Sequence, residues 1–443
     1  MKNKWLIALS AVGIHICIGS VYAWSVLTRP IMASMGFSQK EVTWIFSIAI
    51  LFLGLSAGFL GDYVEKYGPR KSGLAAACFF GTGMLGSALA LHLHSLVLLY
   101  LFYGVIGGIG LGIGYITPVS TLVKWFPKHR GFATGLAIMG FGFAALIAGP
   151  LMQRIVATLG LIPNFLILGC AYIVIISASA LYLAPPPDEF LKANGLPVAS
   201  HGNDVQDRKA GKLDKLKTVA VKLADHPKMG KMLPCVDAFS AKEALQTWHF
   251  YALWWIFFIN ISCGIALLAV ASPMGQEVVG MTPAQAASMV GIIGLVNGGG
   301  RIIWSTVSDY LGRRNVYVLF FLIEIGAFYA LASTTDSFLF QALVLLIISC
   351  YGGGFSCMPA YLSDLFSTKE LSAIHGKILT AWGIAGIMGP LALSVIYENT
   401  HSYSLTLYFF SGCFVLNLVI ALVLKWRTSH HVILQMMREQ SNA

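Results

Sequence analysis

One arginine stands where a charge is least expected in this chain. Arg301 lies inside an apolar segment that runs from about Ser288 to Val307, and it directly follows Gly298–Gly300. A permanent cation at the centre of a membrane helix costs at least about 2.5 to 3.5 kcal/mol, so such residues usually have a function. A guanidinium can hold a carboxylate through paired hydrogen bonds. We predict that Arg301 binds an anion; the alternative is a structural pair with a helix carbonyl or a carboxylate.

Other side chains could share this site. Asn297 precedes Arg301 by one helical turn, which would place both on one face of a helix. His15 lies in the middle third of the first apolar run and could bind the anion or carry a proton, unless it is a packing residue. Aromatic residues could wall a compact cavity around a small anion, although helix packing is the alternative role for each. The aromatic candidates are Tyr22, Trp24, Tyr115, Tyr351, Phe355 and Trp382.

Two carboxylates are further candidates for carrying a proton. Glu324 lies midway along a predicted membrane helix, and an intramembrane carboxylate is a proton-site candidate by default. Glu277 lies at the outer end of another predicted helix. The alternatives are a protonated structural glutamate for Glu324 and a solvated loop charge for Glu277.

The composition is that of a helical membrane protein. The chain has 443 residues, of which 57% are hydrophobic and 11% charged. Apolar runs of about 18 or more residues recur along almost its whole length. We therefore predict an all-α membrane protein with twelve transmembrane helices. The predicted spans are 5–28, 42–62, 72–91, 97–120, 131–153, 161–184, 249–275, 284–307, 316–334, 338–363, 372–396 and 404–425.

The net charge of the chain is +10, and its Lys and Arg residues are unevenly placed on the two sides of the predicted membrane. If the N-terminus is cytoplasmic, 25 of the 29 Lys and Arg residues fall on the cytoplasmic side. The exceptions are Arg29, Lys40 and Arg154 outside and Arg301 within the membrane. This asymmetry follows the positive-inside rule. It predicts a multi-pass protein of the plasma (inner) membrane with both termini cytoplasmic, surrounded by lipid and with no nucleic-acid partner.

The spans divide into two groups of six. We predict an N-terminal six-helix bundle at 1–184, a cytoplasmic linker at 185–248, a C-terminal six-helix bundle at 249–426 and a cytoplasmic tail at 427–443. The linker opens with three prolines and carries mixed charges. Within it, Leu213–Leu223 is either a short amphipathic helix on the membrane or part of a disordered loop.

The two halves repeat each other. Glu65, Gly68 and Arg70 after the second span correspond to Asp309, Gly312 and Arg314 after the eighth, at a constant shift of 244. Gly149-Pro150 in the fifth span corresponds to Gly389-Pro390 in the eleventh, at a shift of 240. Parallel six-helix repeats are typical of one large transporter architecture. The repeat therefore predicts two pseudo-symmetric six-helix bundles.

The two turns resemble the Gly-x-x-x-Asp-Arg-x-Gly-Arg-Arg signature of the major facilitator superfamily, with Glu65-Lys66 replacing Asp-Arg in the first copy. Glycines permit a tight turn, and a carboxylate can cap a neighbouring helix and pair with arginines in one state of the cycle. We assign to this gating motif Gly61, Glu65, Lys66, Gly68, Arg70, Asp309, Gly312, Arg313 and Arg314.

Further segments are similar to the oxalate:formate antiporter family. They are Gly19–Val26, Lys124–Gly131, Lys242–Leu245 with Phe250 and Trp254-Trp255, and Gly352–Phe355 with Pro359. The resemblance implies exchange or co-transport of small carboxylates, as in the more distant monocarboxylate transporters, with an arginine at the place of Arg301. The family's oxalate carriers also bear a lysine in the eleventh span. Here Ile378–Gly389 has no basic residue, and Trp382 lies near that place.

One buried cation balances one carboxylate. We therefore predict a secondary active transporter of a monocarboxylate of the formate, lactate or pyruvate class, working by rocker-switch alternating access. It would be an antiporter or a proton symporter, so a counter-anion or a proton is the coupled partner. The alternatives are an oxalate or other dicarboxylate exchanger, a carrier of an amino acid or drug-like cation, and a carboxylate sensor on the same fold that does not transport.

No catalytic constellation is visible. Serine and cysteine nucleophiles lack a spaced His and Asp, and the eight cysteines are scattered without metal-ligand spacing. We expect a monomeric protein that is not an enzyme and needs no metal or cofactor.

Overall fold

The computed structural model describes residues 2–194, 240–366, 368 and 370–441, and these are mostly helical. The first half contains α1 (Lys4–Gly19), the 3₁₀ turn η1 (Ser20–Ala23), α2 (Ser25–Met35), α3 (Gln39–His92), α4 (Leu96–Leu99), the π-helical η2 (Tyr100–Gly107), α5 (Gly108–Trp125), α6 (Arg130–Leu159), α7 (Leu161–Tyr182) and α8 (Asp188–Ala193). The second half contains α10 (Ala241–Ala244), α11 (Trp248–Val279), α12 (Pro283–Leu311), α13 (Arg313–Ser333), α14 (Ser337–Leu365), α15 (Leu371–Thr400) and α16 (Tyr403–Ser441). The predicted amphipathic segment Leu213–Leu223 lies outside the described residues.

The described residues form 11 helical stretches long and apolar enough to cross a membrane. One of them, α3, has 54 residues, about 80 Å of helix, whereas a bilayer core is about 30 Å thick. The helix turns back at Gly68, whose φ of 78° and ψ of 171° are open to glycine and strained for other residues. Because α3 therefore crosses twice, the fold contains the twelve transmembrane helices expected.

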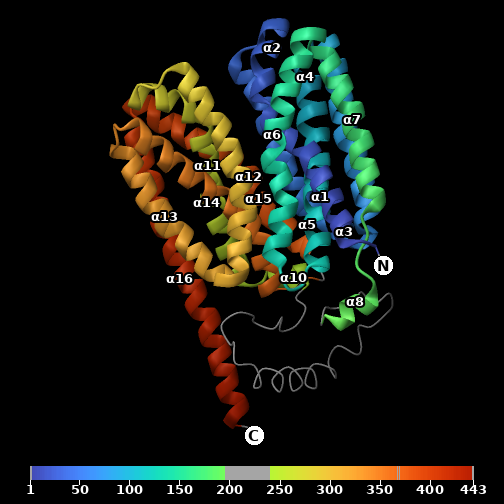
Figure 1. The fold of residues 1–443 in the computed structure, drawn as a ribbon, viewed down its shortest axis with the longest axis vertical. Coiled ribbons are helices and arrows are strands. Elements are labelled where there is room, and N and C mark those ends of the chain that lie inside the picture. Colours follow the sequence, from blue (N-terminus) through green and yellow to red (C-terminus); the bar gives the residue numbers. More distant parts are fainter. Residues whose placement is uncertain (1, 195–239, 367, 369, 442–443) are drawn as a thin grey trace.

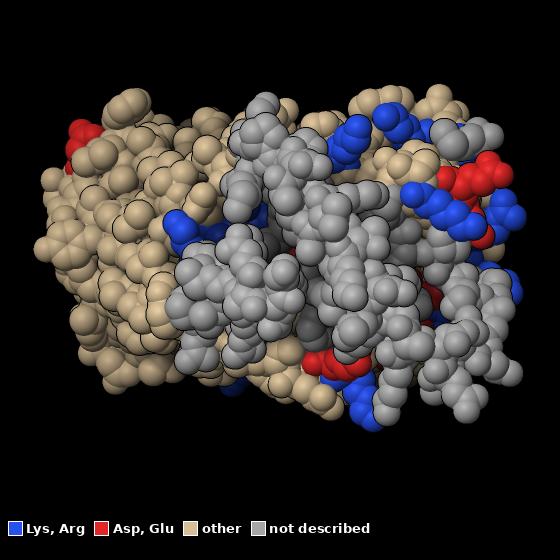
Figure 2. Space-filling model, turned by 90° about the horizontal axis from the view of Figure 1, so that it is seen from below, with Lys and Arg blue, Asp and Glu red and all other residues tan. Residues whose placement is uncertain are grey.

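The helices form two bundles that lie side by side (Figure 1). One bundle contains α1–α7 and the other α11–α16. Both ends of the chain, together with α8 and α10, lie on one side of the molecule, which we call the terminal side. The opposite, far side carries α2 and α4. Basic and acidic side chains both lie on the terminal face (Figure 2).

The bundles meet along two seams, α3 against α15 and α6 against α12. Glycines allow the helices to approach closely there. A methyl group added to Gly54 would lie 2.7 Å from the carbonyl oxygen of Leu379, and one added to Gly142 would lie 2.8 Å from the Cα of Gly298. Farther along α12, a methyl group on Gly291 would meet nothing within 4 Å. The bundles are therefore closed together from the terminal side to mid-depth and separate toward the far side (Figure 1).

Candidate functional site

Arg301 points from α12 into the centre of the molecule and is 0% exposed. Its Nε donates to Oδ1 of Asn297 at 3.3 Å, and its Nη1 donates to the carbonyl oxygen of Ile138, on α6 of the other bundle, at 3.3 Å. Its Nη2 is buried without a hydrogen-bond partner. No carboxylate of the described residues forms an ion pair with Arg301. Of the structural partners considered for Arg301, a helix carbonyl is present, whereas a carboxylate is absent among the described residues.

Other buried donors without a partner surround this guanidinium. The hydroxyl groups of three tyrosines and one indole N–H lack an acceptor among the described residues; they belong to Tyr22, Tyr115, Tyr351 and Trp382. The Tyr22 hydroxyl faces Arg301, Tyr351 and Trp382. A buried polar group left unpaired costs about 1 to 3 kcal/mol, so a cluster of them calls for an explanation. All of these groups can donate, which suits a ligand rich in acceptor oxygens.

Aromatic rings from both bundles enclose the donors. The Trp382 ring centroid lies 4.8 Å from that of Phe355, 5.2 Å from that of Tyr115 and 5.6 Å from that of Phe141. The guanidinium carbon of Arg301 lies 5.1 Å from the Phe355 ring centroid and 5.8 Å from that of Phe141. Cation–π contacts of this kind hold the guanidinium in place without neutralising it.

Small residues on α12 and α14 make room for the arginine stem. A methyl group on Gly300 would lie 2.6 Å from the carbonyl oxygen of Ser349, and one on Gly352 would lie 2.5 Å from that of Asn297. The two helices therefore pack backbone to backbone. The side chain of Arg301 passes along α14, where its Cγ would lie 3.3 Å from a methyl group on Gly352. The hydroxyl of Ser356 on α14 donates to the Arg301 carbonyl oxygen at 2.6 Å, which fixes this turn of α12.

Two histidines lie beside the donor cluster. The His15 ring centroid lies 5.2 Å from that of Tyr115, and its Nδ1 donates to the carbonyl oxygen of Ala11 at 3.0 Å. The His375 ring on α15 lies 6.1 Å from the Tyr115 ring, and neither of its nitrogens has a hydrogen-bond partner. Both side chains are buried, at 0% and 1% exposed.

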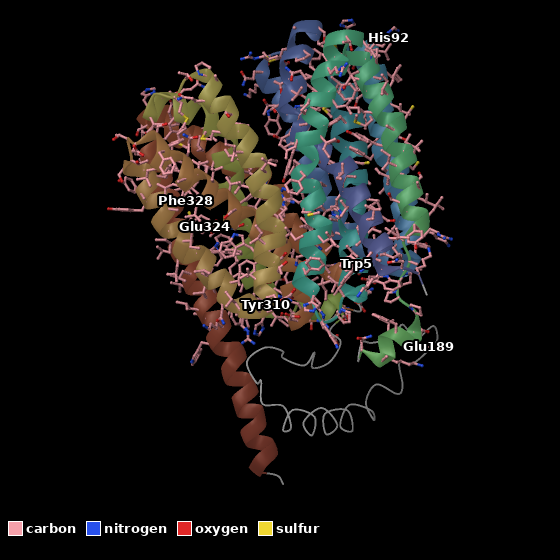
Figure 3. All side chains as sticks on the ribbon, in the orientation of Figure 1. Trp5, His92, Glu189, Tyr310, Glu324 and Phe328 are labelled. Atoms are coloured by element: carbon pink, nitrogen blue, oxygen red, sulfur yellow. The ribbon has the colours of Figure 1, made fainter. Side chains whose placement is uncertain are left out.

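The structure does not bring every predicted residue to this place. Trp24 packs against Tyr103 within the N-terminal bundle, with ring centroids 4.3 Å apart and the rings tilted by 41°. Glu324 lies inside the C-terminal bundle, where Nδ2 of Asn260 donates to its carboxylate at 3.2 Å (Figure 3). Glu277 accepts from the Tyr397 hydroxyl at 2.8 Å on the exposed surface. These three residues make no contact with Arg301 that could couple them directly to a bound anion.

Two residues of the site were missed from the sequence. Phe141 carries no charge or hydroxyl and stands in an apolar run like many other phenylalanines, so no signal marked it. His375 was overlooked because it follows the predicted start of the eleventh span by only three residues. The signal was present, since a histidine in any part of a membrane helix is uncommon.

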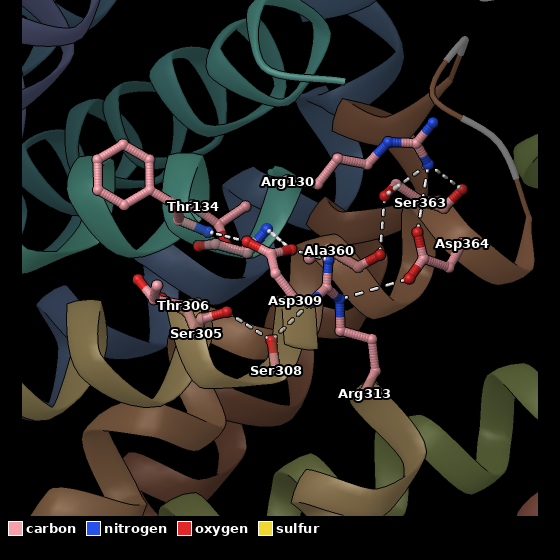
Figure 4. Close-up of polar contacts among 12 residues, drawn as sticks. Arg130, Thr134, Ser305, Thr306, Ser308, Asp309, Arg313, Ala360, Ser363 and Asp364 are labelled. Carbon is pink, nitrogen blue, oxygen red and sulfur yellow. Dashed lines mark hydrogen bonds and ion pairs between the residues drawn. The ribbon is translucent and has the colours of Figure 1, made fainter. Parts of the chain in front are cut away.

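The predicted gating residues form a polar clamp at the terminal side, where each repeat caps a helix of the opposite bundle. The carboxylate of Asp309 accepts from the backbone N–H groups of Gly131 at 2.9 Å and Phe132 at 2.8 Å, in the first turn of α6 (Figure 4). In the other repeat, Glu65 accepts from the N–H of Ser372 at 2.8 Å, in the first turn of α15. Carboxylates are favourable at helix N-termini because of the helix dipole.

Basic residues support the clamp. Arg313 pairs with Asp309, and Arg313 and Arg130 both pair with Asp364, at 3.4 Å and 3.3 Å (Figure 4). In the first repeat, Lys124 pairs with Glu65 at 3.0 Å.

The remaining gating residues accept none of these N–H bonds; some contact their own bundle, and Gly61 contacts the other. Arg70 donates to the carbonyl oxygen of Leu181 at 2.8 Å, and Lys66 lies over the Tyr67 ring. Gly61 lies against Ser372 and Ala373 of α15. Gly312, with φ of 86°, ends α12 in a conformation suited to glycine, and Arg314 follows within the first turn of α13.

Two repeated helical bundles that enclose a buried guanidinium without an acidic partner among the described residues, and that close against each other at one side, are typical of a membrane carrier. The sequence model of the Major Facilitator Superfamily matches residues 9–390 and 251–435, and the chain belongs to this family. It is not an enzyme family: the relatives and solved neighbours are transporters.

The relatives have low sequence identity to this chain, but the similarity extends over almost their full length. The chain is 26% identical to the oxalate:formate antiporter of Oxalobacter formigenes, covering 88% of this chain and 84% of the relative. It is 24% identical to the uncharacterized MFS-type transporter YhjX of Escherichia coli (strain K12), with 87% and 86% covered. It is 24% identical to human monocarboxylate transporter 14, with 95% and 90% covered.

Solved structures share the fold. The human organic anion transporter MFSD10 (TETRAN) has a TM-score of 0.69 at 14% identity, with 95% of this chain and 100% of that chain covered. The transporter FucP in the outward conformation has a TM-score of 0.69 at 12% identity, with 94% and 98% covered.

Proposed function

We propose that this protein carries a small monocarboxylate, of the formate, lactate or pyruvate class, and that Arg301 receives the carboxylate. The supporting observation is a fully buried guanidinium that has no acidic partner among the described residues and is ringed by unpaired donors. A carboxylate offers about four lone-pair positions, so it can accept from Arg301 and several hydroxyls together. One relative is named for oxalate and formate and another for monocarboxylates, so small carboxylates are the class that these relatives share.

The charge of the site favours a monoanion. Arg301 is the one permanent cation among the described residues that surround Trp382, and aromatic rings occupy the remaining space. A second negative charge would be desolvated there without a permanent counter-charge, which is costly in a low-dielectric interior. The same reasoning disfavours a drug-like cation, which would meet Arg301 with like charge and donors with no acceptor.

The transport cycle would use the two seams. The terminal side is cytoplasmic if both termini are cytoplasmic in the inner membrane, so the clamp closes the path to the cytoplasm. An empty site leaves one uncompensated charge in the closed centre, and a bound carboxylate neutralises it. Closing around the anion is thereby favoured over closing empty. This preference supports either obligatory exchange or binding of a proton with the anion.

Counterflow in proteoliposomes tests the assignment. Purified protein is reconstituted with formate, lactate, pyruvate or oxalate inside, and uptake of the labelled anion is measured. Losing one partner of a buried charged pair costs about 2 to 5 kcal/mol, or at least about a 30-fold loss of affinity. Arg301→Ala and Arg301→Lys should therefore abolish uptake at ordinary substrate concentrations. The matched control is Arg154→Ala, an exposed arginine on α6.

The outcomes separate the alternatives. Undiminished uptake by Arg301→Ala, with a folded and monodisperse protein, contradicts the proposal. Faster exchange of oxalate than of formate, lactate or pyruvate would favour the dicarboxylate exchanger. Binding without counterflow of any anion would favour a sensor, and a deletion within 195–239 would then abolish signalling while leaving binding intact.

A further inference from the structure

Two buried imidazoles lie on the terminal side of the Arg301 site and have no part in holding the carboxylate. His375 precedes Trp382 by seven residues on α15, and His15 precedes Tyr22 by seven along α1 and η1. Seven residues are two helical turns, or about 10 Å, toward the terminal side. Tyr115 contacts both imidazole rings. The site thus has two layers. The tyrosines and the tryptophan lie toward the far side, and the histidines lie toward the terminal side.

His15 has a place for one additional proton. Its Nδ1 must carry a hydrogen because the Ala11 carbonyl oxygen, 3.0 Å away, can only accept. In the neutral ring Nε2 is then a hydrogen-bond acceptor, and no group among the described residues donates a hydrogen bond to it. The backbone carbonyl of Tyr115 faces this ring. A proton on Nε2 would turn an unpaired acceptor into a donor directed at a carbonyl oxygen.

The charge of Arg301 opposes that proton until a carboxylate binds. The ionisable groups that face His15 are Tyr115 on α5, Arg301 on α12 and His375 on α15, while α6 presents Phe141. His15 and Tyr115 face His375. From α3, the backbone of Ala57 lies against Gly376, the residue that follows His375 in the chain. No described carboxylate contacts either ring. A carboxylate on Arg301 cancels the repulsion, so anion and proton would each strengthen binding of the other.

We propose, on the basis of the proposed function, that His15 and His375 form a proton-binding pair which makes a proton the companion of the carboxylate. His15 accepts the proton in the N-terminal bundle, and His375 passes it toward the cytoplasm from the C-terminal bundle. The transfer is balanced: His15 Nε2 gains one proton on loading and, before the bundles part, gives it to an unpaired ring nitrogen of His375, which releases it to water and returns to the neutral state. With both partners bound, Arg301 and the carboxylate form a neutral pair, and the added proton lies on the histidine pair nearer the terminal side.

The position of His375 gives the proton an exit. Three residues earlier on α15, the Ser372 hydroxyl donates to the Ser120 hydroxyl at 2.7 Å, and this contact closes the seam below the histidines. Opening the terminal side would part α15 from α5, expose His375 to water and separate it from His15. The proton would leave with the carboxylate, because separation also ends the contact between the two bundles around Arg301.

Binding measured against pH tests the coupling. Formate and pyruvate both remain anions near pH 6.5, the usual midpoint of an imidazole, so a pH effect there belongs to the protein. Calorimetric titration of the full-length protein should show affinity rising toward about tenfold for each unit that the pH falls, the limit for one linked proton. His15→Gln should remove this slope, and His92→Gln, an exposed histidine at the far end of α3, should keep it.

A second measurement counts protons. Proteoliposomes filled with a pH-sensitive dye should acidify as they take up formate or pyruvate, and His375→Gln should slow this acidification at least about fivefold relative to carboxylate exchange. Affinity independent of pH, an unchanged slope in His15→Gln, or uptake without acidification each overturn the inference alone. Absence of any carboxylate binding at every pH overturns the proposed function and this inference together.

Discussion

Neutralising Asp309 should open the terminal side. Only the bonds that cross between bundles affect the conformational equilibrium, and for Asp309 these are the two N–H bonds from Gly131 and Phe132. The pair with Arg313 lies within one bundle, so parting of the bundles does not require it to break. Hydrogen bonds to a charged group contribute about 1.5 to 3 kcal/mol, and Asp309→Asn keeps one neutral acceptor. We expect a shift of about 2 kcal/mol, or about 30-fold, toward the state open at the terminal side.

Distances between spin labels measure this shift. One pair, Lys128→Cys with Tyr310→Cys, reports the α6–α12 seam at the terminal side, and a second pair, Leu159→Cys with Ala284→Cys, reports it at the far side. These four side chains are exposed. The exposed native cysteines Cys78 and Cys170 are replaced beforehand. In Asp309→Asn, the terminal-side distances should lengthen and the far-side distances shorten.

Two comparisons refine the test. Asp336→Asn is the matched control, because Asp336 also caps a helix but does so within its own bundle, at Leu339. It should leave both distances unchanged. Glu65→Gln should give a smaller shift than Asp309→Asn, since Glu65 accepts one cross-bundle N–H and its side chain is 18% exposed against 5% for Asp309. Unchanged distances in Asp309→Asn, or a larger effect of Glu65→Gln, would refute this account of the clamp.

Three further predictions concern the seam and the site. Gly142→Val should reduce transport by at least about tenfold, because its Cβ would lie only 2.8 Å from the Cα of Gly298. Gly412→Ala, whose added methyl group has nothing within 4 Å, should transport normally in the same counterflow assay. Tyr351→Phe should weaken carboxylate binding about fivefold to tenfold, the value of one hydrogen bond of about 1 to 1.5 kcal/mol, without lowering the melting temperature of the empty protein, since the removed hydroxyl has no partner there. Trp382→Lys should raise the ratio of oxalate to formate uptake, because it adds a second cation beside Arg301; an unchanged ratio would show that charge does not set this preference.

How far the sequence predicted the site depends on the kind of residue. A charge in an apolar run is conspicuous, so Arg301 stands out in the sequence, and a duplicated turn at a constant shift marks the residues that form the clamp. Aromatic residues are common in membrane helices, and the sequence cannot tell which face each one occupies. Trp24 was therefore predicted at the site although it packs on Tyr103, and Phe141 was missed although it contacts the guanidinium.

The predicted boundaries of the membrane spans also differ from the helix ends in the structure. The predicted second and third spans are two helices that follow each other directly, because Gly68 turns the chain without the polar loop expected at 63–71. The last helix continues to Ser441, whereas the predicted span stopped at 425. His375 lies three residues inside a predicted boundary, and boundaries from hydropathy carry an error of about three residues. Side chains near a boundary cannot be assigned to water or to the interior without the neighbouring helices.

The repeat explains why the two seams differ. Shifting Arg301 back by 244 residues leads to Ala57 on α3, which is also fully buried. There the partner is Gly376 on α15, and a methyl group on Gly376 would collide with the Ala57 carbonyl oxygen. The α3–α15 seam is thus filled by backbone and has no room for a long side chain. The α6–α12 seam instead holds the guanidinium, which bridges to Ile138 of the opposite bundle. Duplication preserved the clamp in both halves, whereas only one half carries the charge. Because that charge lies in the contact surface of the bundles, whatever neutralises it must also alter how readily they close.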